Sequence, residues 1–333
     1  MQANYLNLTQ VELEARAQAA YHLYRECSVC PHTCKVDRTQ EGRGVCGQSD
    51  RLVVGSAVPH FGEEPPLTGT RGVGNLFVSS CNLSCDYCQN FQISQERMGS
   101  DFSYHQVAQQ MLRLQDEGVH FIGWVSPSHV VPGLLKSLAI ARSKGLRLPI
   151  IYNTNGYDAL PTLKLLDGII DIYLPDLKYA SNDVARELSH IKHYVDHSRE
   201  AVLEMYRQVG PLTLDDSGLA QKGLLIRHLV LPSQLAGTWE TLCFVALELS
   251  PKVPVSLMSQ YQPVNRARDD ARLSRRITVK EYDEALRMAR DLELETVFIQ
   301  DPQEELHNLP DFRKRENPFP LDRANLWESR EVG

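Results

Sequence analysis

The feature that most constrains the fold is a regular alternation of short apolar runs with amphipathic stretches from Asn75 onward. The apolar runs are rich in β-branched residues, as is typical of buried strands. They are NLFVSS (75–80), HFIGWV (120–125), RLPIIYN (147–153), GIIDIYL (168–174), GLLIRHLVL (223–231) and PVSLMSQY (254–261). Helices are predicted over 103–118, 133–144, 158–166, 183–209, 239–249 and 278–292, the last before the run ETVFIQ. Strand and helix alternating in this way give parallel βα units, and about six units are fewer than the eight of a closed TIM barrel.

The composition indicates a folded protein without a strong electrostatic attraction for polyanions. Of the 333 residues, 42% are hydrophobic and 23% charged, which argues against general disorder and against a fibrous protein. The net charge of -7 argues against nucleic acid or anionic lipid as a partner, because both are bound mainly through excess Lys and Arg. We therefore expect small molecules or proteins as partners.

Nothing in the sequence predicts export or insertion into a membrane. The N-terminus, MQANYLNLTQVELEARAQAAYHLYREC, lacks the basic start and apolar stretch of a secretory signal. No run of about 18 apolar residues occurs, so we expect a cytoplasmic protein that does not span a membrane. Because the cytoplasm keeps thiols reduced, metal binding explains eight cysteines better than disulfides do.

Three regions can be separated along the chain. Residues 1–70 hold a helix and then a Gly-rich, polar, cysteine-containing segment that cannot bury much by itself, so something other than a core is expected to fix its shape. Residues 71–300 carry the alternating strands and helices. Residues 301–333 contain Pro and mixed charge and are expected to form a tail packed on the barrel.

Three cysteines follow the first predicted strand. Cys81, Cys85 and Cys88 have the spacing CxxxCxxC, which lets one short loop supply three thiolates to an iron–sulfur cube. Such clusters normally take four protein ligands, so one iron is left open. The amine and carboxylate of S-adenosylmethionine could chelate that iron, and reduction of the cluster could then break a carbon–sulfur bond and release a 5′-deoxyadenosyl radical. The alternatives are a zinc site with a remote fourth ligand, or three unconnected core cysteines.

Four further cysteines lie nearer the start of the chain. Cys27, Cys30, Cys34 and Cys46 offer a complete ligand set with Gly-rich turns, which suits a closed zinc site able to fold a segment that lacks a core. The same set suits an auxiliary iron–sulfur cluster equally well, so both metals stay open. Cys243, alone in TLCFVALEL, is expected to be a core residue.

The stretch GTRGVGNLFVSSCNLSCDYCQN resembles the opening of the radical S-adenosylmethionine (radical SAM) superfamily, and within it the pyruvate formate-lyase activating enzymes and their PflX-like relatives. The likeness covers roughly residues 25–300 and continues through YNTNGY (152–157), DIYLPDLKY (171–179), IRHLVLP (226–232) and VSLMSQYQP (255–263). It implies a partial (β/α)6 TIM-like barrel with an N-terminal Cys-rich metal-binding extension. It also implies a 4Fe–4S cluster on Cys81, Cys85 and Cys88, S-adenosylmethionine as cofactor, and an electron donor such as flavodoxin or ferredoxin.

The resemblance also implies contacts with the cofactor at the ends of the first three strands. Tyr87 stands where the superfamily usually has an aromatic residue against the adenine, although simple packing would explain it too. Ser126 and the backbone after it stand where many members have a GGE-type stretch that holds the amine, and this sequence departs from that pattern. Asn153, Thr154 and Asn155 would line the ribose and methionine part. The alternative for them is a turn that uses Asn and Gly for positive φ.

Charged residues follow the next two strands. Asp176 and Lys178 match a motif of the activating enzymes and, being two apart on a strand, share a face that could meet the zwitterionic end of methionine; the alternative is an exposed ion pair. Arg227 lies inside an apolar strand, where a buried guanidinium needs a partner. A cofactor carboxylate would supply one, and an internal ion pair with Asp171 or another acid is the alternative.

These features favour an enzyme that cleaves S-adenosylmethionine reductively and abstracts hydrogen from a substrate. By the resemblance, that substrate could be the backbone glycine of a glycyl radical enzyme; a small molecule or a non-glycyl protein is the alternative. A hypothesis from a different class is an electron-transfer or scaffold protein that carries metal centres without radical chemistry. A nucleic-acid-binding zinc module is disfavoured by the pI of about 5.9.

Overall fold

The structure is a computed structural model that describes residues 2–301, 309–319 and 327–331. Its strands form two sheets. The first has the order β3 (Ser100–Phe102), β1 (Leu52–His60), β2 (Val73–Val78), β4 (Phe121–Val125), β5 (Ile150–Thr154), β6 (Ile172–Pro175), β8 (Ala220–Leu224) and β7 (Thr213–Leu214). The second has the order β12 (Glu328–Glu331), β11 (Thr296–Ile299), β10 (Val255–Met258) and β9 (Ile226–Leu229).

The two sheets are parts of one curved layer. Only Leu225 separates β8 from β9, and its amide N–H donates to Tyr173 of β6 (3.0 Å). The chain stays beside β6 beyond that point, because the Leu177 N–H donates to the Arg227 carbonyl (2.8 Å). All neighbours from β2 through β4, β5, β6, β8/β9 and β10 to β11 are parallel. The mostly parallel α/β fold expected from the alternation is therefore present, and it is consistent with a partial barrel.

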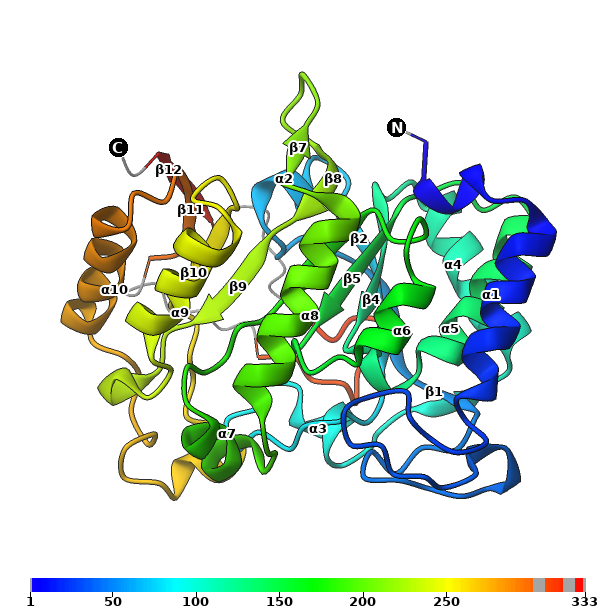
Figure 1. The fold of residues 1–333 in the computed structure, drawn as a ribbon, viewed down its shortest axis with the longest axis horizontal. Coiled ribbons are helices and arrows are strands. Elements are labelled where there is room, and N and C mark those ends of the chain that lie inside the picture. Colours follow the sequence, from blue (N-terminus) through cyan, green and yellow to red (C-terminus); the bar gives the residue numbers. More distant parts are fainter. Residues whose placement is uncertain (1, 302–308, 320–326, 332–333) are drawn as a thin grey trace.

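The strands that the periodicity did not predict flank this parallel run or form a hairpin. β1 pairs with β2 in antiparallel orientation and β12 pairs with β11 in the same way, so each end of the parallel run is covered by an antiparallel strand. β7 and β8 form an antiparallel pair that projects from the body (Figure 1). The seventh parallel strand, β11, is the run ETVFIQ that follows the last predicted helix.

Helices form the outer layer, as Figure 1 shows. They are α1 (Gln10–His22), α2 (Pro65–Thr68), α3 (Phe91–Ser94), α4 (Tyr104–Asp116), α5 (Val131–Ser143), α6 (Leu160–Leu165), α7 (Asn182–Ser189), α8 (Tyr194–Val209), α9 (Thr238–Phe244) and α10 (Val279–Asp291). Ser103 and Gln106 cap α4 reciprocally, as do Thr278 and Glu281 on α10. The single helix predicted over 183–209 is two helices, because the turn after α7 has left-handed residues.

The N-terminal segment packs against the barrel through its own apolar residues. Leu13 and Ala17 of α1, together with Tyr24 and Cys27, belong to the same core as the barrel strands and helices. The guanidinium of Arg38, which is buried, donates to the carbonyls of Ser49 and His129 and lies 4.1 Å from the Tyr24 ring centre. The loop around the four early cysteines is thus attached to the barrel by a core contact and a buried cation.

The described parts of the C-terminal region contact both ends of the parallel run. Phe312 packs edge-on against Phe77 of β2 (ring centres 5.5 Å apart), and Phe319 lies 5.3 Å from the same ring. The Trp327 indole N–H donates to the Gly62 carbonyl (3.0 Å), and β12 extends the sheet at β11. The predicted tail includes 302–308, 320–326 and 332–333, which lie outside the described residues. In the described part, the structure has no helix with the length and apolarity that a membrane crossing requires.

Candidate active site

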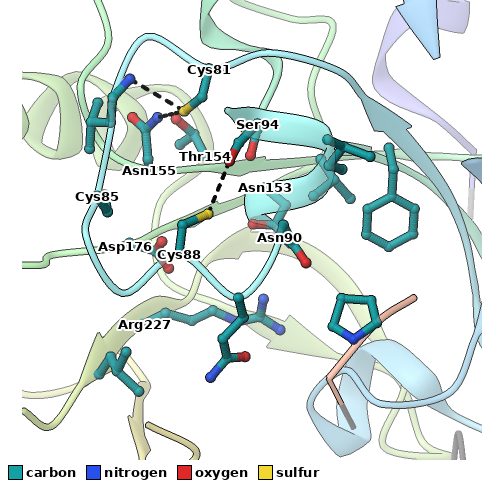
Figure 2. Close-up of a pocket in the computed structure, with 18 of the residues that line it drawn as sticks. Cys81, Cys85, Cys88, Asn90, Ser94, Asn153, Thr154, Asn155, Asp176 and Arg227 are labelled. Atoms are coloured by element: carbon teal, nitrogen blue, oxygen red, sulfur yellow. Dashed lines mark hydrogen bonds between the residues drawn. The ribbon is translucent and has the colours of Figure 1, made fainter. Parts of the chain in front are cut away.

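A cavity of about 250 Å³ opens where the carboxyl ends of the parallel strands meet. Its wall includes every residue that the sequence analysis proposed for the cluster and the cofactor: Cys81, Cys85, Cys88, Tyr87, Ser126, Asn153, Thr154, Asn155, Asp176, Lys178 and Arg227. Figure 2 shows the cysteine loop on one side of the cavity, with Asp176 beside Cys88 in this view and Arg227 below them. The carboxyl edge of a parallel sheet is where ligands bind in folds of this class.

The cysteine loop is held by backbone contacts on both sides. Ser80, just after β2, has a left-handed backbone (φ 69°), and its N–H donates to the Ile93 carbonyl (2.8 Å), which turns the chain into the loop. On the other side, the N–H groups of Ser84 and Asp86 donate to the last turn of α7 (3.2 and 2.9 Å). This loop therefore has a defined path between β2, α3 and α7.

Each of the three thiols contacts at least one polar side chain, and Cys81 also donates to Asn82 Oδ1 (3.8 Å). The amide Nδ2 of Asn155 donates to Cys81 Sγ (3.3 Å), the hydroxyl of Ser189 donates to Cys85 Sγ (3.0 Å), and Ser94 Oγ lies 3.2 Å from Cys88 Sγ. The donors lie at the ends of three separate elements, β5, α7 and α3. In metal sites, contacts of this kind orient the sulfur ligands and tune the properties of the metal.

These three thiols need a nearby positive charge to lose their protons and become metal ligands. Burial raises the pKa of Cys81 to about 12 and that of Cys85 to about 11, and it raises the pKa of Cys88 as well. At neutral pH the thiols are therefore protonated unless positive charge replaces the protons. Iron ions would supply that charge, and three sulfurs on one loop beside a cavity fit the ligand set of a cluster with one open iron.

Asp176 and Lys178, which were expected to share a face toward the methionine end of the cofactor, form an ion pair with each other. Lys178 Nζ lies 2.5 Å from Asp176 Oδ2, and their side chains are only 17% and 22% exposed, so the pair is not the exposed one considered as the alternative. Burial alone would lower the pKa of Lys178, but the attraction of Asp176 outweighs it and raises that pKa above its usual value. The cavity wall thus carries a fixed cation close enough to Cys85 and Cys88 to favour their thiolates.

Arg227 also lines the cavity, but its guanidinium already has internal partners. It donates to both oxygens of Glu64 (2.8 and 2.7 Å) and to Glu63. The internal ion pair considered as an alternative is therefore formed, with two glutamates in place of Asp171. Asp171 instead accepts the backbone N–H groups of Asn4 and Ile150 (2.8 Å each).

The polar residues at the ends of β4 and β5 differ in the hydrogen bonds that they make with other residues of the protein. Thr154 donates to Asp158 (2.5 Å), and Asn155 donates to Asn82 (2.7 Å) in addition to Cys81. In the turn that follows, the positive φ belongs to Gly156, and Asn155 Oδ1 accepts the backbone N–H of Tyr157 (2.9 Å), so Asn155 also supports the turn. Ser126 itself is left-handed (φ 55°). Tyr87 lines the cavity, its hydroxyl donates to Tyr179 (2.7 Å), and its ring packs against those of Tyr179 and Tyr261.

Four residues around this cavity escaped the sequence analysis. Glu63 and Glu64 precede a Pro-Pro pair in a stretch with no periodicity, and only the structure brings them to Arg227. Ser94 and Ser189 are serines at helix ends, a position in which serine is common for reasons unrelated to metals. The acidic pair was the only one of these with a signal, since a buried Arg227 demanded a carboxylate.

The early cysteines come together in the loop below α1. Cys27, Cys30 and Cys46 are buried and Cys34 is half-buried, and Cys27, Cys34 and Cys46 each affect the pKa of Cys30, which burial raises. Gly44 approaches Cys34 so closely that a Cβ there would meet its sulfur at 2.7 Å. Within residues 2–301, 309–319 and 327–331, no group of three His, Cys, Asp or Glu side chains has the arrangement of a single-ion site.

Comparison with known proteins concerns the central part of the chain. The family model of the radical SAM superfamily matches residues 75–214, which includes the cysteine loop and the strands β2 to β6. An uncharacterized protein of Methanocaldococcus jannaschii is 28% identical over 296 residues, which are 86% of this chain and 80% of that protein. The relative carries no stated activity.

Two solved structures are also similar to this chain, at lower sequence identity than the relative above. A radical SAM methyltransferase from Sphaerobacter thermophilus is 15% identical, with a TM-score of 0.43 over 68% of this chain and 66% of the other. HydG, a maturase of the FeFe-hydrogenase, is 10% identical, with a TM-score of 0.45 over 86% of this chain and 62% of the other. Similarity at this level says nothing about the substrate of this chain. The match of the family model across the cysteine loop supports membership of the radical SAM superfamily, whose enzymes use a 4Fe–4S cluster and S-adenosylmethionine.

Proposed function

We propose that this chain cleaves S-adenosylmethionine reductively at a 4Fe–4S cluster held by Cys81, Cys85 and Cys88, and then removes hydrogen from a substrate. One observation carries the proposal. Three thiols on one loop, of which Cys85 is buried and Cys81 and Cys88 are half-buried, share a single cavity with all eight residues that the sequence analysis proposed for the cofactor. These eight residues come from the ends of β4, β5 and β6, from β9 and from the cysteine loop itself. A cysteine site in an electron-transfer or scaffold protein would not need polar and charged groups converging on it from those strands.

The chain's residues have separate tasks in this proposal. A reduced cluster, when bound, supplies the electron that breaks a carbon–sulfur bond of the cofactor. Asp176 and Lys178 offer one negative and one positive group to the amino acid part of the cofactor, within a site where low exposure strengthens both. Asn153 and Ser126 offer polar groups at the ends of β5 and β4, and the Tyr87 ring offers an apolar face.

In this proposal Arg227 does not bind a carboxylate of the cofactor, as was first expected. Its guanidinium is already bound to Glu63 and Glu64, so its charge is neutralised within the protein. The side chain therefore defines the shape of the interior end of the cavity and does not offer an unpaired charge to the cofactor. Aromatic and apolar residues of the C-terminal region, Pro310, Phe319 and Trp327, complete the wall. Together these groups exclude water from the reacting atoms.

For the substrate we propose two candidates. The PflX-like resemblance supports the backbone glycine of a glycyl radical enzyme. A small molecule is favoured by a specific observation, since C-terminal side chains of the chain itself occupy part of the cavity wall that a protein loop would have to reach. A flavodoxin or ferredoxin would supply the electron, and no nucleic acid or membrane is involved.

The test of the cofactor chemistry is direct. Anaerobically reconstituted protein reduced with dithionite is expected to convert S-adenosylmethionine to 5′-deoxyadenosine and methionine. Cys85→Ala should abolish product formation, whereas Cys243→Ala, which changes a cysteine outside the cavity, should leave it unchanged. If wild-type protein with an intact, reducible cluster forms no 5′-deoxyadenosine with either candidate substrate present, the electron-transfer class is the better explanation.

We propose that a metal site holding zinc or an auxiliary iron–sulfur cluster is formed by the N-terminal cysteines Cys27, Cys30, Cys34 and Cys46. The support is a set of four thiols on one loop, three of them buried and Cys34 half-buried, although among the described residues they do not have the arrangement of a single-ion site. Iron, zinc and sulfide analysis of anaerobic protein separates the two metals. One cluster per chain with stoichiometric zinc would eliminate the auxiliary cluster, and two clusters without zinc would eliminate zinc.

A further inference from the structure

We propose that Ser189, the last residue of α7, is a positioning residue that raises the reduction potential of the cluster through its hydrogen bond to Cys85. The proposal rests on the function above, in which Cys85 is a cluster ligand. Ser189 does not line the cavity, so it acts on the cluster from behind its ligand. It is fully buried, 104 residues away from Cys85 in the sequence.

The direction of the hydrogen bonds around Ser189 follows from the number of hydroxyl protons. Ser189 has one proton, which it donates to Cys85 Sγ (3.0 Å). The contact between Tyr179 and Ser189 (2.7 Å) must then be donated by Tyr179, and Tyr179 in turn accepts from Tyr87 (2.7 Å). Three hydroxyls thus point the same way and end on one sulfur.

Such a chain strengthens its last bond. Each hydroxyl that accepts a hydrogen bond becomes a better donor, and burial keeps water from competing. Tyr87, Tyr179 and Ser189 are each at most 5% exposed. The Cys85 sulfur therefore receives a stronger hydrogen bond than an isolated serine would give.

The consequence for the cluster is electrostatic. Reduction adds negative charge, part of which resides on the sulfurs, so a donor at a sulfur stabilises the reduced state more than the oxidised one. Because Cys85 is buried (9% exposed), water supplies little of that stabilisation at its sulfur. Ser189 is thus expected to make the cluster easier to reduce.

The backbone of the region makes Ser189 a clean site for substitution. The carbonyls of Ser189 and Leu188 accept from the N–H groups of Ser84 and Asp86, and these bonds hold the cysteine loop without the hydroxyl. Ser189→Ala therefore removes the donor and keeps the loop in place. Asn155, which donates to Cys81, and Ser94, whose hydroxyl lies 3.2 Å from the Cys88 sulfur, both line the cavity, so their substitution would also change the cavity wall.

The experiment is a redox titration of the reconstituted full-length protein, followed by absorbance and electron paramagnetic resonance, with iron and sulfide measured on the same samples. Ser189→Ala is expected to bind the same iron and to show a lower midpoint potential. At a fixed potential, the ratio of reduced to oxidised cluster should fall several-fold, a tenfold fall being about 59 mV for a one-electron couple. Tyr179→Phe should shift the potential less in the same direction, and Ser189→Thr should restore it.

Ser137→Ala is the matched control. Ser137 is equally buried, and its hydroxyl donates to the Gly133 carbonyl within α5 (2.9 Å), so its loss should leave the potential unchanged. An unshifted potential in Ser189→Ala with full iron content would overturn the proposal, as would an equal shift in Ser137→Ala. If Ser189→Ala loses its cluster, Tyr179→Phe and Ser189→Thr decide in its place. A wild-type chain that takes up no cluster would instead overturn the proposed function, and this proposal with it.

Discussion

At the scale of single residues, Arg227 is the clearest case of a charge whose partners only the fold supplies. Its guanidinium lies inside the barrel between Glu63 and Glu64, which are 5% and 0% exposed. Asn75 donates to Glu63 (2.7 Å) and Ser256 donates to Glu64 (2.6 Å), so the carboxylates have further donors. Burial alone would raise the pKa of Glu63, but the charge of Arg227 outweighs it and the pKa falls to about 2.

Replacing this cation should reverse the pH dependence of stability. Glu63 has a lowered pKa in the folded wild type, so its contribution is present above 4.5, the ordinary value, and is lost as the pH falls towards about 2. In Arg227→Leu, two buried carboxylates without a cation should have raised pKa values, and the variant should gain stability as the pH falls from neutral towards about 4.5. At neutral pH the loss should be about 3–5 kcal/mol.

Thermal and urea unfolding between pH 4.5 and 8 measure this effect. Arg272→Leu is the control, because Arg272 makes similar pairs with Glu187 and Asp270, whose side chains are 53% and 24% exposed, so about 1 kcal/mol or less is expected. Equal losses in the two variants, or a stability of Arg227→Leu that falls with acidity as in wild type, would contradict the electrostatic account.

At the scale of elements, the attachment of the N-terminal loop to the barrel depends on Arg38. Its side chain spans from Ser49 in the loop to the His129 carbonyl in η3 (Pro127–His129), so one cation joins two segments far apart in sequence. His129 itself is buried, and its Nε2 lies 3.0 Å from the Ser79 carbonyl. Burial lowers its pKa to about 4, which leaves it neutral at physiological pH.

Arg38→Gln should therefore loosen the loop without unfolding the barrel. The variant keeps an amide but cannot reach both carbonyls, and each hydrogen bond from a charged donor is worth about 1.5–3 kcal/mol. Limited trypsin digestion should cut sooner at Arg43 and Arg51, which lie in the same segment, while the barrel fragment persists. Arg25→Gln, at an exposed position, should digest like wild type. Uniform loss of the whole chain in Arg38→Gln would show that the loop and the barrel unfold together.

At the scale of the whole molecule, the described C-terminal segments connect the two ends of an open sheet. Residues 309–319 pack on β1 and β2, and β12 pairs with β11, the last of the parallel strands. Phe312 is 1% exposed between Phe77 and Phe319. Because Phe319 and Trp327 also line the cavity, this closure protects the place where a cluster would be bound.

Phe312→Ala should weaken that closure. Loss of a buried aromatic side chain costs about 3–5 kcal/mol locally. Because the contact is local, the unfolding temperature of the barrel should change little while bleaching of the reconstituted cluster by a chelator becomes several-fold faster. Absorbance of the cluster against time measures this. Leu309→Ala, in the same segment but 38% exposed, should bleach at the wild-type rate. Equal rates in both variants would mean that the segment does not shield the site.

The sequence by itself determined the features that repeat locally. Apolar runs and amphipathic stretches predicted the parallel α/β layer, because a buried strand and a half-buried helix each leave a periodic signal. The spacing of Cys81, Cys85 and Cys88 predicted one ligand loop, since three thiols within eight residues cannot be far apart. Asp176 and Lys178 were predicted to share one face for the same local reason, whereas their ion pair with each other was only the alternative.

Only the tertiary structure decided the contacts between distant segments. The pairing of Arg227 with Glu63 and Glu64, the approach of Ser189 to Cys85 and the antiparallel strands β1 and β12 join segments that no short pattern relates. A buried charge demands a partner but does not say which of many acids it is. A serine at a helix end has the same local signature whether its hydroxyl caps the helix or donates to a sulfur. Packing selects among such equivalents, and packing depends on the whole chain.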